Sequence, residues 1–260
     1  QDSYLEISYA KDQGFALQLG KKMFNQIAAS YGSETEGLKR WTQAYLACVA
    51  AVDENVGQVL DALDGTHLKD NTIVVLASDH GFHMGEKDYL YKNSLWEEST
   101  RVPLLMRVPR VTKPNSKISK AVSLIDVYPT LMELCELPNE TKKNEQGHHL
   151  DGSSMKSLLE NPTSESWIGD RPALTVVFAG PLYKNMPQKQ HYAIRTDRFR
   201  YILYNNGKEE LYDHQNDPHE WNNLVLSEKN QEKTLINMRQ QLAMMLSPIE
   251  LEGLKIKNNK

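Results

Sequence analysis

The feature of this sequence that most constrains its fold is the apolar run "NTIVVLAS" at residues 71–78, which Asp79, His80 and Gly81 follow directly. The run is short, continuous and rich in β-branched residues. It predicts a strand buried on both faces, as in a parallel sheet with helices on each side. Ligand crevices in open α/β sheets form at the carboxyl ends of such strands. The polar residues that follow are therefore candidates for a functional site.

A helix is predicted before this strand, at residues 38–63, where apolar side chains recur at spacings of three and four. Ser33 or Thr35 can cap its start, and Gly65 can end it. The helix and the strand after it form the first unit of an alternating pattern.

The alternation continues after the strand. Residues 101–109 read as a second strand bounded by prolines, and residues 125–137 read as a helix with Asp126 as its cap and Pro129 in its first turn. Helices that alternate with strands indicate an α/β sandwich. We assign residues 1–145 to that domain.

The pattern changes beyond about residue 140, so we assign residues 146–260 to a linker and a small C-terminal subdomain. The linker is polar and rich in turn residues. Strand-like runs follow at 173–179, at 191–204 with a break at Asp197, and at 209–213. A last helix at about 227–246 places Leu235, Met238, Leu242 and Met245 on one stripe. Consecutive strands with short turns predict an antiparallel sheet packed by a helix.

Composition excludes several classes of protein. The formal net charge is −4, and the 30 basic residues form no basic run, so we expect no nucleic-acid partner. No apolar stretch approaches the roughly 20 residues of a membrane span. Cys48 and Cys135 lie on apolar stripes without metal-ligand spacing, so we expect buried, inert thiols. The first residues contain neither a signal peptide nor an initiator Met, and we expect the chain to begin inside a longer protein.

Asp79 and His80 are candidate metal ligands. A carboxylate at a strand end can bind a hard divalent cation, but Ca²⁺ takes six or more ligands and the sequence offers two adjacent ones. His80 would be an unusual calcium ligand, so residue type leaves the identity of the metal open. Gly81 allows the backbone to turn sharply beside a ligand.

Lys92, thirteen residues after Asp79, can hold an oxygen of a tetrahedral anion as a point charge. The alternative for a single lysine is a solvated surface residue. His83 is either a substrate contact or a loop residue. Glu97, Glu98 and Arg101 read as a structural set of salt bridges.

The segment "TIVVLASDHGFHMGEKDYLYKNSLWEESTRVPLLMRVP" closely resembles the second signature region of type I sulfatases, in the alkaline phosphatase superfamily. "VSLIDVYPTLMELCELP" is similar to the helix that follows it in that family. "AIRTDRFRYILYNNGKEELYDHQNDPHEWNNL" resembles the C-terminal subdomain, which ends in an Asp-Pro-x-Glu-x-x-Asn-Leu pattern. Within the family the chain resembles the iduronate-2-sulfatase-like branch. The implied fold is an alkaline phosphatase/sulfatase-like sandwich with a small C-terminal subdomain.

The resemblance implies roles for individual residues. Asp79 and His80 match two ligands of the active-site calcium, and Lys92 matches the lysine that grips the substrate sulfate. Phe82 matches a position that often packs against the sugar. The loop before His191 corresponds to a region of substrate contacts. Its two lysines are Lys184 and Lys189.

The sequence also departs from the family pattern. Sulfatases use a formylglycine made from Cys or Ser in a Cys/Ser-x-Pro/Ala-x-Arg motif, and neither Cys48 nor Cys135 lies in such a motif. The remaining calcium ligands and the histidine that protonates the leaving alcohol belong to the N-terminal half of the family. The resemblance therefore implies the C-terminal half of a sulfatase, which is inactive alone and needs the N-terminal half as its partner.

The function that the resemblance implies is hydrolysis of a sulfate ester, with a sulfated carbohydrate as the expected substrate and Ca²⁺ as the cofactor. A phosphonate monoester or phosphodiester hydrolase of the same superfamily stays open, and so does a non-catalytic relative that binds anionic glycans. Relatives are usually periplasmic, secreted or lysosomal. An association of two chains cut from one precursor is a third alternative.

Overall fold

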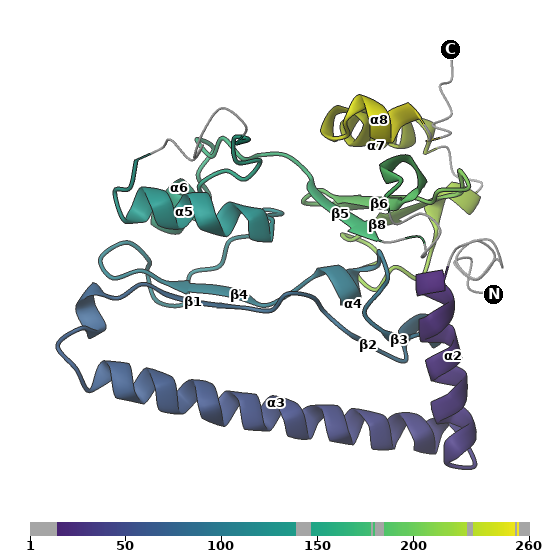
Figure 1. Cartoon of the computed structure of the whole chain (residues 1–260), viewed down its shortest axis with the longest axis horizontal. Helices are drawn as coiled ribbons and strands as arrows, with labels where there is room; N and C mark the ends of the chain where they lie inside the picture. The colour runs from purple at the N-terminus through teal and green to yellow at the C-terminus, as the bar shows by residue number, and fades with distance from the viewer. Residues whose placement is uncertain are drawn as a thin grey trace.

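The computed structural model describes residues 15–138, 147–177, 179, 185–227, 231–252 and 254. Helix α2 (Phe15–Ser30) leads into the 31-residue helix α3 (Glu34–Asp64), which runs along one side of the molecule (Figure 1). Ser33 caps α3, because its side chain accepts a hydrogen bond from Glu36 N, and Gly65 follows its last residue. The predicted helix is confirmed.

The strand predicted at 71–78 forms, but its expected surroundings are wrong for the described residues. Strand β1 (Val74–Ala77) pairs antiparallel with β4 (Leu104–Arg107) in a two-stranded ribbon. The segment between the two strands reverses the direction of the chain, so β4 runs antiparallel beside β1 and no crossover connection joins them. Leu76 and Leu105 are 39% and 57% exposed, because no described segment covers those faces.

The loop between β1 and β4 carries the candidate site residues, and we call residues 79–101 the site loop. It contains a short hairpin of β2 (His83–Met84) and β3 (Leu90–Tyr91), joined by the 3-10 turn Glu86–Asp88, and the single-turn helix α4 (Glu97–Thr100). Lys87 has a positive φ of 58° in that turn. The hairpin packs near the first turns of α3, as Figure 1 shows.

The helix predicted at 125–137 is a 3-10 turn (Leu124–Asp126) followed by α5 (Val127–Leu134). Asp126 does not cap α5 with its side chain. It forms a capping box with Ser123 one turn earlier, and its Oδ1 accepts a hydrogen bond from Ser153 N at 2.8 Å. The linker contains a short helix that its polar composition concealed, α6 (Lys156–Glu160).

The C-terminal region forms the predicted antiparallel sheet, with strands in the order β5–β6–β7–β8. The strands are β5 (Ala173–Val177), β6 (His191–Arg195), β7 (Phe199–Leu203) and β8 (Glu209–Asp213). Helix α7 (Glu232–Met245) and the short α8 (Pro248–Glu252) follow them (Figure 1). The turn expected at Asp197 separates β6 from β7, which confirms the predicted break.

Both faces of this sheet are buried. One face packs on α7, through Tyr192, Ile194, Tyr201, Leu203, Leu211, Met238 and Leu242. The other face packs on the site loop, through Tyr89, Leu95, Trp96, Ala193, Ile202, Tyr204 and Tyr212. Alternate residues of each strand supply the two faces. The sheet therefore supports the site loop directly.

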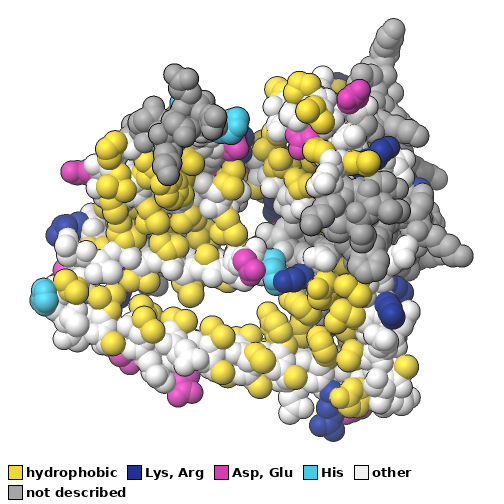
Figure 2. Space-filling model, viewed as in Figure 1, with side chains coloured by type: hydrophobic (Ala, Val, Ile, Leu, Met, Phe, Trp, Pro, Cys, Tyr) yellow, Lys and Arg dark blue, Asp and Glu magenta, His cyan; other side chains and the backbone are white. Residues whose placement is uncertain are grey.

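Much of the apolar stripe of α3 is exposed. Val52 and Val59 are 58% and 69% exposed, and hydrophobic side chains of α3 border an opening that faces the β1–β4 ribbon (Figure 2). Cys48 and Cys135 are exposed too, so the expectation of buried thiols is wrong for the described chain. The apolar stripe predicted the helix correctly. It did not predict that the other described residues would leave much of the stripe exposed.

None of the helices in the described ranges is long and apolar enough to cross a membrane.

Candidate active site

Asp79 and His80 lie just beyond β1, where the sequence predicted a ligand site. The side chain of Asp79 is 84% exposed, and its Oδ1 accepts a hydrogen bond from His80 N at 3.0 Å. The Ser78 hydroxyl donates to His80 O at 2.8 Å and holds the turn. The carboxylate of Asp79 is therefore exposed at the end of the strand, where a ligand could reach it.

The ring of His80 is oriented by close contacts at both nitrogens, and its Nε2 also lies 3.6 Å from Asp79 Oδ2. Nδ1 lies 2.8 Å from Gly81 O, and Nε2 lies 2.7 Å from Lys92 Nζ. A carbonyl only accepts and an ammonium only donates, so Nδ1 carries the proton and Nε2 is the acceptor. A histidine that binds a metal through one nitrogen usually donates its other N–H to a carbonyl or carboxylate. Nδ1 of His80 fits that pattern, and a metal at Nε2 would replace Lys92 as the partner of the lone pair.

Lys92 reaches the strand end from beyond β3. The contact between its Nζ and His80 Nε2 brings a cation beside Asp79 and His80, although thirteen residues separate Lys92 from Asp79. An ammonium and a carboxylate with an imidazole at one point provide charge of both signs. Such a site can hold a tetrahedral anion and a divalent cation together.

Gly81 closes the site loop. Its N donates to Ser99 O at 2.8 Å, so the two ends of the loop meet beside His80. A Cβ at Gly81 would lie 1.9 Å from Glu98 O, a distance too short for any side chain to fit there. The requirement for glycine is a close approach of two backbones.

Phe82 is half-buried in a group of aromatic rings. Its ring stacks with those of Trp41 and Tyr45, at centroid distances of 6.4 and 6.3 Å, and meets Tyr91 edge-on at 6.2 Å. These contacts attach the site loop to α3. Tyr45 is 42% exposed next to Phe82, so part of the group remains open to a ligand.

His83 is fully buried, and its Nε2 lies 2.7 Å from Ser94 Oγ. Its ring meets Tyr89 and Trp96 edge-on. Burial, reinforced by Lys87, lowers the pKa of His83 to about 3, so the ring is neutral. Of the two alternatives that the sequence left open, this geometry favours a residue that shapes the loop.

The other predicted substrate contacts lie at the start of β6. Lys189 is exposed in a 3-10 turn (Pro187–Lys189), and Asn205 Nδ2 donates to its carbonyl at 3.1 Å. His191 is fully buried, and its Nδ1 accepts from Asn205 N at 3.1 Å. Lys184 lies outside the described residues. Of the two described residues of this group, Lys189 is exposed to solvent and His191 is not.

The predicted set of salt bridges has different partners from those expected. Glu97 pairs with Arg195 at 3.3 Å and with Arg200, both from the C-terminal sheet, whereas Arg101 is exposed. Glu98 is mostly buried, and burial raises its pKa to about 7. The sequence did not identify Arg200 as a partner, because about a hundred residues separate it from Glu97. The one signal in the sequence was that Arg200 lies within an otherwise apolar strand, where a charged side chain needs a partner.

A second group with metal-binding residue types lies under the site loop. Glu97, His214 and Glu220 each offer a ligand atom, and these atoms lie within 4.8 Å of one another. Arg200 donates to both carboxylates, however, and is itself buried. The guanidinium already bonds and neutralises both acids from a buried position, whereas the ammonium beside His80 belongs to a part-buried lysine and leaves the carboxylate of Asp79 84% exposed. We interpret the group as an ion-pair network, and Asp79 with His80 as the better candidate for a metal.

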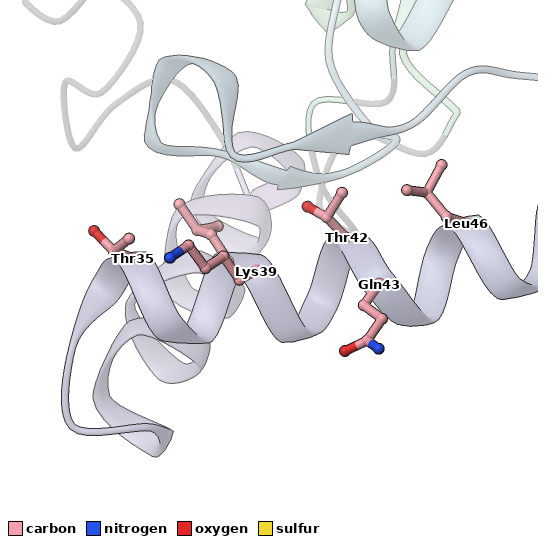
Figure 3. Close-up of a pocket in the computed structure, with 6 residues that line it drawn as sticks. Thr35, Lys39, Thr42, Gln43 and Leu46 are labelled. Atoms are coloured by element: carbon pink, nitrogen blue, oxygen red, sulfur yellow. The ribbon is translucent and has the colours of Figure 1, made fainter.

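One pocket, of about 540 Å³, lies beside the first half of α3 (Figure 3). Its lining residues are Thr35, Leu38, Lys39, Thr42, Gln43 and Leu46. None of the candidate site residues lines it. It belongs to the uncovered side of α3.

Comparison with protein families gives two matches. A model described as Sulfatase matches residues 10–137, and a model described as N-sulphoglucosamine sulphohydrolase, C-terminal, matches residues 85–247. The two overlap across the site loop. The second covers more than half of the chain.

Two bacterial relatives show the same relationship. A sulfatase of Formosa agariphila is 39% identical over 185 residues, which are 71% of this chain and 32% of the relative. An N-acetylglucosamine-6-O-sulfatase of Bacteroides thetaiotaomicron is 35% identical over 192 residues, which are 72% of this chain and 32% of the relative. The chain thus spans about a third of the length of these curated relatives.

Solved structures agree with this assignment. A protein in complex with its substrate D-glucosamine-2-N,6-O-disulfate superposes with a TM-score of 0.68 at 31% identity, over 82% of this chain and 41% of that one. A phosphonate monoester hydrolase of Agrobacterium radiobacter gives 0.66 at 24% identity, over 87% and 44%, and shows likeness of fold alone. The α/β architecture is that of the alkaline phosphatase-like sulfatases. The chain belongs to the sulfatase family and corresponds to its C-terminal part.

Proposed function

We propose that the complete protein hydrolyses a sulfate ester of a carbohydrate, and that this chain supplies part of the active site. The observation that carries the proposal is the contact of Lys92 Nζ with His80 Nε2 at 2.7 Å beside the exposed Asp79. It places an ammonium that can bind an anion beside a carboxylate and an imidazole that can bind a cation. Relatives named for sulfated sugars support the substrate class.

In this proposal Asp79 and His80 hold a divalent cation, with Ca²⁺ as our choice because a carboxylate is a hard oxygen ligand. The cation would polarise the sulfate and offset its charge. The further ligands and the formylglycine nucleophile come from the N-terminal part.

Lys92 holds one sulfate oxygen through its ammonium group. Charge on the sulfate and on the leaving oxygen grows as the S–O bond breaks, and a fixed cation stabilises that charge. In the structure the one lone pair of His80, at Nε2, accepts from Lys92 Nζ. A cation bound at Nε2 would take that lone pair, and the ammonium of Lys92 beside it would bond the sulfate oxygen instead. Phe82 and the neighbouring Tyr45 offer an aromatic surface to the sugar. Lys189 extends the substrate region, and the buried His191 supports the turn of Lys189 through Asn205.

The partner in this proposal is the N-terminal part of the same protein, packed on the uncovered side of α3. The apolar residues of α3 that are exposed include Leu46, Val49, Val52 and Val59. A contiguous apolar surface of this kind marks an interaction site. The match covers 32% of each curated relative, so the rest of a relative is about twice as long as the matched part and could cover this surface. We infer a periplasmic, secreted or lysosomal location from the family resemblance.

The test is an assay of the complete protein with a 6-O-sulfated glucosamine, an aryl sulfate and an aryl phosphonate. Turnover of the sulfate esters is expected. Preference for the phosphonate would instead support the phosphonate hydrolase, and tight binding of the sulfated sugar without turnover would support a glycan-binding protein.

A further inference from the structure

The Asp-Pro-x-Glu-x-x-Asn-Leu pattern at residues 217–224 forms a turn after β8. Asp217 begins the turn, because its carboxylate accepts hydrogen bonds from Trp221 N at 3.0 Å and Asn222 N at 2.7 Å. Glu220 has a positive φ of 57° and no exposed surface. A non-glycine residue in this conformation is strained, so the surroundings must hold Glu220 in place.

Glu220 contacts the site loop at two points. Its Oε2 accepts a hydrogen bond from Glu97 N at 3.0 Å, and its backbone carbonyl accepts one from Lys87 Nζ. Lys92 lies between these two anchors, five residues from each. One residue of the C-terminal region therefore holds both sides of the segment that carries Lys92.

Arg200 extends this attachment. Its Nε donates to Glu220 Oε1 at 2.6 Å, and its Nη1 donates to Leu95 O at 3.1 Å. It also bonds the carboxylate of Glu97. Arg200 is 2% exposed. Its geometry depends on Glu220, because the two share a direct ion pair.

The anchor at Lys87 is enclosed by aromatic rings. Its Nζ lies 5.4 Å from the ring of Trp96, 5.0 Å from that of Tyr212 and 5.4 Å from that of Trp221. Cation–π contacts of this kind strengthen when they are desolvated. The side chain of Lys87 joins the site-loop turn to the C-terminal sheet.

Glu220 stays charged in this environment. Burial alone would raise the pKa of Glu220, but Arg200, His214 and Lys87 outweigh it and bring the pKa to about 2. His214 Nε2 lies 2.8 Å from Glu220 Oε1. The carboxylate therefore acts as a permanent negative centre for the cations and the amide around it.

We infer that Glu220 is a positioning residue for Lys92: it holds the site loop at Lys87 and Glu97 so that the ammonium of Lys92 stays beside His80. This rests on the proposed function only for the role of Lys92 in turnover. The hydrogen bonds that hold the loop are independent of that role.

The test is a double-mutant cycle in the complete protein, with Glu220→Ala and Lys92→Ala. If Glu220 acts through Lys92, Glu220→Ala should lower kcat/KM roughly tenfold or more in the wild type and change it little in the Lys92→Ala background. A merely structural effect would multiply with that of Lys92→Ala. Independent effects of the two changes would overturn the inference.

Glu209→Ala is the matched control. Glu209 is also a buried carboxylate of the same sheet, paired with Arg239 Nε and Nη2 at 2.7 and 2.6 Å, but it lies on the face that packs on α7. It should lower the melting temperature without the coupling to Lys92. An equal coupling for Glu209→Ala would contradict a specific role for Glu220. If Glu220→Ala does not fold, Glu220→Gln keeps the length and one acceptor oxygen.

Hydrogen–deuterium exchange separates this inference from the proposed function. Backbone amides of the site loop should exchange roughly tenfold faster in Glu220→Gln than in Glu209→Gln, whether or not the protein hydrolyses sulfates. Equal exchange in the two variants would overturn the inference. Absence of sulfatase activity with faster exchange would overturn only the proposed function.

Discussion

The ammonium of Lys92 lies 2.7 Å from Nε2 of His80, because the antiparallel pairing of β2 with β3 brings together the residues that precede and follow the hairpin. Because Nδ1 of the same ring faces Gly81 O, the imidazole presents its lone pair to Lys92. In the proposed function a metal ion would replace Lys92 at this lone pair, and the ammonium would bond a sulfate oxygen.

Lys92→Ala in the complete protein should lower kcat/KM for a sulfate ester by roughly 10²–10³-fold, the loss that follows removal of one group that stabilises developing charge. Lys92 is part-buried, and among the described residues its ammonium bonds a single ring nitrogen, so the melting temperature should change little. The control is Lys113→Ala, which removes an exposed lysine from another loop. Full activity of Lys92→Ala would refute the assignment of the sulfate grip.

Asp79→Asn should weaken the retention of calcium, because an amide lacks the negative charge that a hard cation requires. The measurement is elemental analysis of the protein after gel filtration in metal-free buffer. Asp70→Asn, at an exposed aspartate in the turn before β1, is the control. Equal calcium content in the two variants would count against the metal site.

Gly81→Ala should destabilise the protein by about 1–3 kcal/mol, because the new Cβ would lie 1.9 Å from Glu98 O and would force the ends of the site loop apart. Denaturant unfolding measures the difference. Gly57→Ala is the control: a Cβ there meets nothing within 4 Å, and alanine favours the helix by about 0.5–1 kcal/mol. Equal stability of Gly81→Ala and the wild type would show that the loop relaxes freely.

His83 should make the folded protein less stable at acidic pH. Its pKa in the folded state, about 3, lies below the ordinary histidine value of 6.5, so only the unfolded chain gains a proton as the pH falls below 6.5. Stability is therefore present above pH 6.5 and lost below it, by about 2 kcal/mol at pH 5. Wild type should lose that much more than His83→Gln between pH 7 and pH 5. Glu98 titrates in both proteins and cancels in the comparison.

Val52→Asp should weaken the association of α3 with the N-terminal part, because it places a charge on the exposed apolar stripe. With the two parts expressed as separate chains, less N-terminal part should co-purify with the variant. Asp53→Asn, at the exposed neighbouring position, is the control. Undiminished recovery with Val52→Asp would place the partner elsewhere.

Local pattern predicted the elements well and their partners poorly. The spacing of apolar residues located α3, and the short apolar runs located β1 and the C-terminal strands, because periodicity reports which residues share a face. The same run could not reveal that β1 pairs antiparallel with β4. A short apolar strand has the same composition in either sheet, and its pairing depends on distant chain.

The site was predicted to a similar extent. Asp79, His80 and Lys92 come together as the sequence led us to expect, and their roles stay predictions. Arg200 and Glu220 were not identified as partners of the site loop. Charges spaced about a hundred residues apart carry no local signal, and the stabilisation they give depends on burial that only the fold provides.

The sheet β5–β8 is buried between α7 on one face and the site loop on the other. The region after residue 146 therefore cannot be removed without exposing apolar side chains of the site loop. Without it, Trp96 and Leu95 would lose their cover, and the segment that carries Lys92 would have no fixed wall to lie against. A substitution in the core of this sheet can therefore reduce catalytic activity in a protein that still folds, although the substituted residue does not contact the substrate.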